Sequence, residues 1–240
     1  MTGIAGFAGS IRAVVIGASG GIGAAVTQRL LADSGVTEVL ALSRRPVAPA
    51  GKLRTGFLDL ADEASIVDAA AMAGAAEFVF VASGLLHQDG VQPEKSWRTL
   101  DAAALARLFQ VNAIGPALVA KHFLPRLPRH GRAVFAVLSA KVGSIADNRL
   151  GGWYGYRASK AALNQIVRTS AIELSRTHPQ SVLLSLHPGT VATSLSEKYA
   201  GTHARTEPVQ SARNLLAALD ARPAADTGGF FAYDGQPIPW

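Results

Sequence analysis

The sequence contains no cysteine among its 240 residues, which excludes disulfide bridges, thiolate nucleophiles and cysteine-ligated metal centres. It also has no stretch of about 18 uncharged apolar residues, and residues 1–12 lack the basic and apolar segments of a signal peptide. Acidic residues are the minority, with 17 Asp and Glu against 23 Lys and Arg, yet the net charge of +6 is scattered along the chain. These absences predict a soluble, cytoplasmic protein without a metal site, and they disfavour a membrane or a nucleic acid as partner.

Hydrophobic residues make up 49% of the chain, and they occur as short apolar runs that alternate with helical patterns. This alternation predicts a parallel sheet covered by helices on both faces. A chain of 240 residues buries one core and leaves little room for a second. We therefore expect a single α/β domain over residues 1–240, a Rossmann-type doubly wound sheet of about seven strands. The expected strands are 14–16, 36–42, 53–58, 77–84, 133–138, 182–186 and 229–233.

The first of these strands runs directly into a glycine-rich turn, Gly17-Ala18-Ser19-Gly20-Gly21-Ile22-Gly23, which then enters a helical pattern. Glycines have no Cβ, so the backbone can turn sharply and approach a pyrophosphate, while the free N–H groups of the next helix point at that anion. The spacing differs from the usual G-x-G-x-x-G fingerprint. A glycine-rich turn that binds no ligand is the alternative.

The most specific stretch surrounds Tyr156 and Lys160. Side chains four residues apart are neighbours on one helix face, about 6 Å from each other. A cation at that distance, with an effective dielectric constant near 20, favours the phenolate by about 3 kcal/mol, or about two pKa units. The pair is therefore predicted to work as an acid–base catalyst at neutral pH.

Together with the glycine turn and the serine at the end of the fifth strand, this pair resembles the short-chain dehydrogenase/reductase family over essentially the whole chain. The similarity is greatest to its small C-factor-like and sniffer-type carbonyl reductase members. The resemblance implies hydride exchange between a nicotinamide cofactor and a small-molecule carbonyl or alcohol substrate. It also implies a homodimer or homotetramer built on the helices of Asn112 and Tyr156. Ala161, Ala162 and Ala171 are expected to be exposed there, unless they pack only on the sheet.

The end of the second strand bears on the choice of cofactor. An acid at this point accepts hydrogen bonds from the ribose of NAD and repels a 2′-phosphate, whereas this chain has Ser43-Arg44-Arg45. A hydroxyl followed by a guanidinium binds phosphate well. The sequence thus favours NADP(H), with NAD(H) still admissible, unless these arginines merely solvate a loop.

The resemblance assigns the other site residues. Tyr156 is implied to protonate the carbonyl oxygen while Lys160 lowers its pKa and holds the ribose. Asn112 is implied to bend its helix so that a backbone carbonyl holds a relay water, although a simple helix-bending amide is the alternative. Asp59 is implied to bind adenine, and Asp59 or Asp62 also suits the N-cap of the next helix. The implied cofactor-binding residues are Gly17, Ser19, Gly21, Ile22, Gly23, Ser43, Arg44, Asp59, Leu60, Ser83, Gly84, Tyr156, Lys160, Pro188, Gly189, Val191 and Thr193.

The chain departs from the family pattern in two places. The usual Asn-Asn-Ala-Gly is Val81-Ala82-Ser83-Gly84, and the threonine before the first glycine is Ile16, so we expect apolar packing to replace a polar brace. The second serine that ends the fifth strand is Ala140. Ser139 is the preferred source of the catalytic hydroxyl, although strand alternation turns it away from the side of Ala140 unless the chain twists. Ser144 is the competitor, and a site without a serine is the third alternative.

Two readings outside catalysis stay open. A nucleotide-sensing regulator would keep the glycine turn but would not need the Tyr156–Lys160 pair, and a C-factor-like signalling protein could keep every motif. A sugar-nucleotide epimerase would need a longer substrate domain. His187, alone at a strand end, is interpreted as structural rather than as a metal ligand or base. The loops that would choose the substrate, 85–94, 145–153 and 194–205, follow no readable motif.

Overall fold

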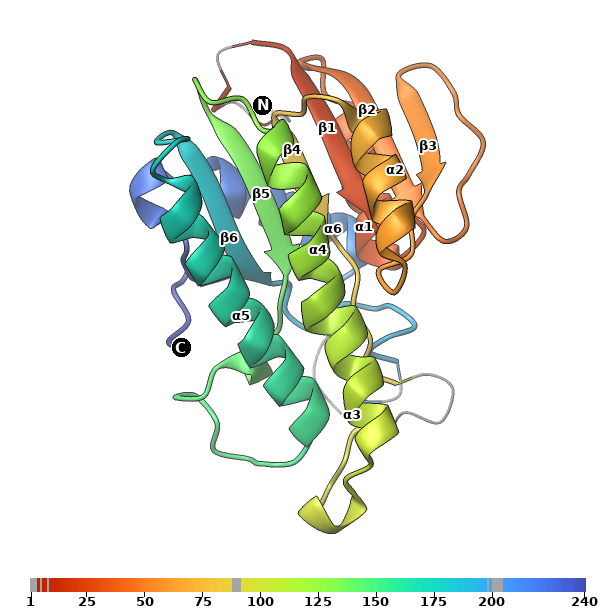
Figure 1. The fold of residues 1–240 in the computed structure, drawn as a ribbon, viewed down its shortest axis with the longest axis vertical. Helices are drawn as coiled ribbons and strands as arrows, with labels where there is room; N and C mark the ends of the chain where they lie inside the picture. The colour runs from red at the N-terminus through yellow and green to blue at the C-terminus, as the bar shows by residue number, and fades with distance from the viewer. Residues whose placement is uncertain (1–3, 5, 8, 88–91, 198, 200–204) are drawn as a thin grey trace.

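A seven-stranded parallel sheet with helices on both faces forms the protein (Figure 1). The computed structural model describes residues 4, 6–7, 9–87, 92–197, 199 and 205–240. The strand order is β3-β2-β1-β4-β5-β6-β7, and every neighbouring pair is parallel. The expected Rossmann-type sheet is therefore confirmed. Its strands are β1 (Ile11–Ile16), β2 (Val36–Ser43), β3 (Leu53–Phe57), β4 (Phe78–Val81), β5 (Ala133–Leu138), β6 (Ser181–His187) and β7 (Phe230–Ala232).

Two apolar layers cover the sheet. On the face nearer the viewer in Figure 1, Ile66 of α2, Phe123 of α4 and Leu163 of α5 pack into one buried cluster with the strands. On the far face, Leu30 of α1 and Leu215 of α6 belong to a second cluster. Because both faces are covered, the central strands are apolar on both sides. The helices are α1 (Gly21–Leu31), α2 (Glu63–Ala73), α3 (Ala102–Phe109), α4 (Gly115–Phe123), α5 (Tyr154–Leu174) and α6 (Pro208–Asp220).

The chain order reverses between β1 and β4, since β2 and β3 lie on one side of this pair and β5 to β7 on the other. Ligands of such sheets bind beyond the carboxyl ends of the strands at this switch point. Apolar packing was expected to replace a polar brace between these two strands. This is confirmed, because Ile16 pairs in register with Val81 and both side chains are buried. The topology therefore brings the glycine turn after β1 next to the segment after β4.

One long helical run, 102–126, consists of α3, a π-helical turn (Gln110–Ile114), α4 and a final short turn. Of the described helices, it alone reaches the length and apolar composition of a membrane span, a test that core helices of water-soluble proteins also pass. In this fold Val119 and Phe123 of the run are buried in the apolar layer. Asn112 lies at the centre of the π turn and is fully buried.

Two local expectations need correction, and one open alternative is decided. Ala171 is buried in the core because its face of α5 packs on the sheet, whereas Ala161 and Ala162 are only half-buried. The fourth strand ends at Val81 rather than at residue 84, since the chain there leaves the sheet to line a pocket. The N-cap of α2 is Asp62, whose carboxylate accepts a hydrogen bond from the Ala64 amide.

Candidate active site

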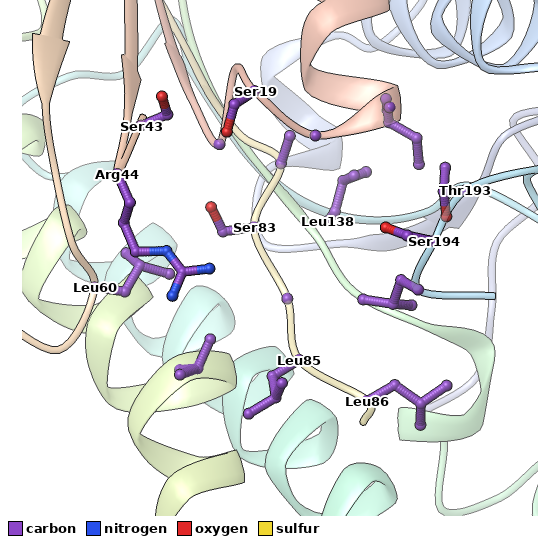
Figure 2. Close-up of a pocket in the computed structure, with 18 of the residues that line it drawn as sticks. Ser19, Ser43, Arg44, Leu60, Ser83, Leu85, Leu86, Leu138, Thr193 and Ser194 are labelled. Atoms are coloured by element: carbon purple, nitrogen blue, oxygen red, sulfur yellow. The ribbon is translucent and has the colours of Figure 1, made fainter. Parts of the chain in front are cut away.

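A pocket of about 540 Å³ opens at the carboxyl edge of the sheet. Figure 2 shows Ser43 and Arg44 at one end, Thr193 and Ser194 at the other, and Ser83 between them. Most residues predicted for the site line this single pocket, although they come from distant parts of the chain. They are Gly17, Ser19, Gly21, Ile22, Ser43, Arg44, Asp59, Leu60, Ser83, Gly84, Ser139, Tyr156, Lys160, Pro188 and Thr193.

The glycine turn is packed too closely for side chains. Gly17 has φ +84°, and a Cβ there would lie 2.5 Å from Ser83 Oγ. A Cβ on Gly23 would lie 2.2 Å from the Gly17 carbonyl oxygen, so Gly23 closes the turn without lining the pocket. Helix α1 begins at Gly21 with no side-chain cap and no acid in its first turn. Its free N–H groups and positive dipole end thus remain available to a phosphate.

The end of β2 supplies cations to the pocket. Ser43 is buried, and its Oγ accepts a hydrogen bond from the Arg45 amide at 3.3 Å. Arg44 and Arg45 both line the pocket, and Figure 2 shows the Arg44 side chain directed into it. Within the described chain neither arginine forms an ion pair. Two unpaired guanidinium groups beside a phosphate-binding turn fit a dinucleotide that carries an additional phosphate.

Asp59 follows β3 and turns toward the pocket instead of capping α2. Its carboxylate accepts a hydrogen bond from the Ala61 amide at 3.0 Å, and its backbone N–H and carbonyl both bond to the Ser65 hydroxyl. Leu60 lies beside it on the pocket wall (Figure 2). This end therefore combines a fixed carboxylate with an apolar surface, a combination suited to a heteroaromatic base.

Tyr156 and Lys160 share one buried face of α5 and are 8% and 2% exposed. Lys160 Nζ lies 6.0 Å from the centroid of the Tyr156 ring and donates a 2.9 Å hydrogen bond to the Leu138 carbonyl oxygen. The predicted spacing is thus correct, but the predicted pKa effect is wrong for the protein alone. Burial raises the pKa of Tyr156 above its usual value and lowers the pKa of Lys160 to about 7. The Coulomb argument omitted the cost of removing both charges from water, which dominates here.

Asn112 acts as a clamp on the segment that follows β4. Its Oδ1 accepts a hydrogen bond from the Leu85 amide at 2.7 Å, and its Nδ2 donates to the Leu85 carbonyl at 2.8 Å and to Ser159 Oγ at 3.1 Å. A Cβ on Gly84 would lie 3.5 Å from Lys160 Nζ and 3.6 Å from Asn112 Oδ1. Asn112 does not line the pocket itself, but it fixes the wall next to Lys160.

The two serines considered as the source of the catalytic hydroxyl, Ser139 and Ser144, have different surroundings, and Ala140 follows the first of them. Ser139 lines the pocket, and its buried Oγ has no hydrogen-bond partner in the described part of the chain. Ala140 packs in a small apolar cluster with Tyr156, at the place where the family resemblance implied a serine. Ser144 does not line the pocket, and its Oγ accepts a hydrogen bond from the Asp147 amide at 3.1 Å. The geometry therefore leaves Ser139 as the candidate with an unused hydroxyl.

The loop after β6 reaches the pocket through Pro188 and Thr193. Gly189 and Val191 do not line it. Gly189 has φ +75°, and a Cβ there would lie 2.9 Å from the Tyr233 ring. Val191 is buried and forms an isolated parallel β-bridge with Thr206. Burial lowers the pKa of His187 to about 4, so this imidazole is neutral at pH 7. That state agrees with its structural interpretation.

Several lining residues were given no individual role by the sequence analysis. Leu85, Leu86, His87, Ser194 and Leu195 belong to the loops that it expected to choose the substrate, and the others follow mainly from packing. Arg107 and Val111 are four residues apart on the helical run that carries Asn112, so helical periodicity could have indicated that they share a face. Leu85, Leu86 and His87 simply continue the segment that begins at Ser83 (Figure 2 shows the two leucines). The remaining ones are Gly20, Arg45, Leu58, Ala82, Leu138, Ser194 and Leu195.

Known proteins are similar to this chain in sequence and in fold. Residues 12–203 match the family profile described as short chain dehydrogenase. The chain is 37% identical over 142 residues to C-signal of Myxococcus xanthus, covering 59% of this chain and 81% of that protein. It is 31% identical over 229 residues to 1-hydroxy-2-glutathionyl-2-methyl-3-butene dehydrogenase of Rhodococcus sp. (strain AD45), covering 95% and 98%.

Among solved structures, NADPH-bound carbonyl reductase from chicken fatty liver superposes with a TM-score of 0.82 at 25% identity, covering 97% of this chain and 100% of that one. The family match spans most of the chain, from the glycine turn past the Tyr156–Lys160 pair to the loop after β6. The chain therefore belongs to the short-chain dehydrogenase family and is an oxidoreductase that acts on CH–OH or C=O groups with a nicotinamide cofactor.

Proposed function

We propose that the protein is an NADP(H)-dependent carbonyl reductase, able to run in reverse as an alcohol dehydrogenase. The observation that carries this proposal is the buried Tyr156–Lys160 pair, which opens onto the same pocket as the glycine turn and Arg44. A protein that only senses a nucleotide has no use for a phenol and an ammonium buried together. The name of the similar dehydrogenase from Rhodococcus and the NADPH in the chicken carbonyl reductase support the same class of reaction.

The proposed cofactor site follows the length of the pocket. The glycine turn with Ser19 and Ile22 and the N-terminus of α1 hold the pyrophosphate, and Asp59 and Leu60 receive the adenine. Ser43 and Arg44 hold the 2′-phosphate by charge-assisted hydrogen bonds. Ser83, Gly84, Pro188 and Thr193 complete the wall toward the nicotinamide, together with the backbone near Gly189 and Val191. NAD(H) lacks the phosphate, so it would bind to the same site more weakly.

The cofactor, when bound, supplies the hydride for the carbonyl carbon of the substrate. Tyr156 donates the proton to the carbonyl oxygen. Burial alone raises the pKa of Tyr156 and makes the phenol a weaker acid, so this role requires a charged Lys160 beside it. Lys160 stabilises the phenolate that remains, and Asn112 is a positioning residue that holds the wall beside Lys160. Ser139 is the proposed donor of a hydrogen bond to the carbonyl oxygen.

We also propose that the chain forms a homodimer or homotetramer in the cytoplasm. Ile114 and Ile172 are exposed on the helices that carry Asn112 and Tyr156, and Ala161 and Ala162 are half-buried on the second of these helices. Burying such apolar side chains against a second copy favours association.

The first test concerns the 2′-phosphate. Charge-assisted hydrogen bonds contribute about 1.5 to 3 kcal/mol, so NADPH is expected to bind about ten- to a hundred-fold more tightly than NADH. In Arg44→Asp the carboxylate repels the phosphate, so the order of affinities should reverse. Isothermal titration calorimetry with both cofactors measures this. Equal affinities in the unaltered protein would contradict the proposed role of Arg44.

The second test concerns proton donation. Tyr156→Phe keeps the ring and removes the acid, so turnover should fall at least about 10²-fold while NADPH affinity stays nearly the same. Tyr154→Phe is the matched control, because Tyr154 is on the same helix but 38% exposed and outside the pocket lining. NADPH oxidation at about 340 nm with a panel of aldehydes, ketones and quinones reports the turnover. Similar activities in the two variants, or no turnover by the unaltered protein, would refute the proposal.

The third test concerns the hydroxyl. Ser139→Ala is expected to lower turnover roughly 10²-fold, as the loss of one oxyanion donor does. Ser144→Ala should lower it much less, since that oxygen is used by the Asp147 amide. Ala140→Ser restores the family residue beside Tyr156 and should raise turnover or rescue Ser139→Ala. A larger loss in Ser144→Ala, with the fold intact by circular dichroism, would transfer the role to Ser144.

A further inference from the structure

Four aromatic rings form a continuous arc of contacts, and the two rings at its ends, Tyr156 and His87, line the pocket. Ring centroids are 6.2 Å apart between Tyr156 and Trp153, 5.8 Å between Trp153 and Tyr199, and 5.1 Å between Tyr199 and His87. The first ring of the arc is the proposed acid, and the last is an imidazole. An apolar cluster that includes Leu85, Leu86 and Ala140 packs against the arc. A bound molecule near Tyr156 would therefore meet an apolar wall that ends at His87.

The arc is held in place by contacts between three loops. The Tyr199 hydroxyl donates a hydrogen bond to Gln92 Oε1, which joins the loop after β6 to the loop after β4. Trp153 has a left-handed backbone with φ 54°, and its amide donates to the Glu94 carbonyl. The Glu94 carboxylate in turn accepts from the Gly155 amide at the start of α5. A strained residue persists where its surroundings over-determine it, so the arc is preorganised.

His87 is the polar member of this wall that lacks a partner. It lines the pocket, and its Nε2 is buried without a hydrogen bond to any group in the described ranges. Buried polar atoms in proteins are nearly always hydrogen-bonded. Among the described residues, His87 contacts the ring of Tyr199 and shares the pocket lining with the apolar Leu85, Leu86 and Leu195, none of which offers Nε2 an acceptor. The natural partner is then a group on the bound molecule.

The charges of the pocket indicate the chemistry of that group. The charged side chains that line it are the cations Arg44, Arg45, Arg107 and Lys160 and a single anion, Asp59. Asp59 follows β3, at the end proposed for adenine, and Arg44 and Arg45 are proposed to face the 2′-phosphate. Arg107, exposed at the rim, is a further cation that the proposed cofactor contacts do not use. A positive pocket favours an anionic oxygen over a neutral or cationic group.

We infer that His87 is a specificity-determining residue, whose Nε2–H binds a carboxylate on the substrate at a distance from the reacting carbonyl. The inference rests on the proposed function and adds the substrate class to it: an apolar, ring-bearing ketone or aldehyde with a distal carboxylate. The carbonyl of such a molecule meets Tyr156 and its carboxylate meets His87, while its body contacts the apolar lining of Leu85, Leu86 and Leu195.

The test compares ketones that differ only in the distal group: acetophenone, methyl 4-acetylbenzoate, and 3- and 4-acetylbenzoate. NADPH oxidation gives kcat/KM for each with the unaltered protein, His87→Phe and His87→Gln. Phe keeps the ring contact with Tyr199 and removes the nitrogen, whereas Gln restores an N–H near the position of Nε2. In His87→Phe, kcat/KM for at least one acetylbenzoate should fall about ten- to a hundred-fold relative to acetophenone, mainly through KM. His87→Gln should regain part of the loss, and the ester should respond less.

Because intrinsic reactivity cancels in the ratio of variant to unaltered protein, the substituent's electronic effect does not confuse the result. NADPH affinity, measured on each variant, shows that the pocket is intact, and His87→Gln gives the result if His87→Phe fails to fold. Equal losses for all four ketones would overturn the inference. So would turnover of other carbonyls with no turnover of these four. If NADPH neither binds nor is oxidised with any carbonyl, the proposed function itself fails.

Discussion

Lys160 places an ammonium group in an interior that is 2% exposed, and the rest of the site is arranged around holding it there. Its Nζ is anchored to the Leu138 carbonyl at the end of β5. Gly143 allows the close contact, because a Cβ there would lie 2.8 Å from Lys160 Cβ, and Gly84 leaves room near Nζ. Such burial is unfavourable for a charge, which is why the pKa of Lys160 falls to about 7. The protein thus keeps a group that is poised between charge states beside the phenol of Tyr156.

The same constraint connects the two halves of the pocket. The clamp from Asn112 to Leu85 fixes the segment after β4, which carries Gly84 against Lys160 on one side and Ser83 against Gly17 on the other. A displacement of this segment would disturb both the glycine turn and Lys160. The acid–base pair and the dinucleotide turn are therefore coupled through a single backbone segment, which is consistent with one reaction that uses both.

Much of this arrangement could be predicted from the sequence, because backbone close approach and helix periodicity leave local signatures. The glycine turn, the parallel sheet of an α/β alternation and the Tyr156–Lys160 spacing are of this kind. Effects that depend on burial could not be predicted: the sign of the Tyr156 pKa shift, the core position of Ala171, and the unpaired imidazole of His87. Each of these properties depends on which residues of distant elements pack against the side chain, and a local motif does not specify that packing. Trp153 is similar, since nothing local marks it for a left-handed conformation.

The proposed mechanism requires a charged Lys160 beside Tyr156, so the pKa of Lys160 must rise when the negatively charged cofactor occupies the pocket. Proton uptake on NADPH binding at about pH 8.5, obtained from calorimetry in buffers of different ionisation enthalpy, tests this directly. With a pKa of about 7, Lys160 is mostly neutral in the free protein at that pH, and a neighbouring anion raises its pKa. We predict uptake of close to one proton by the unaltered protein and almost none by Lys160→Met. Tight binding without proton uptake, or equal uptake in both proteins, would contradict the account.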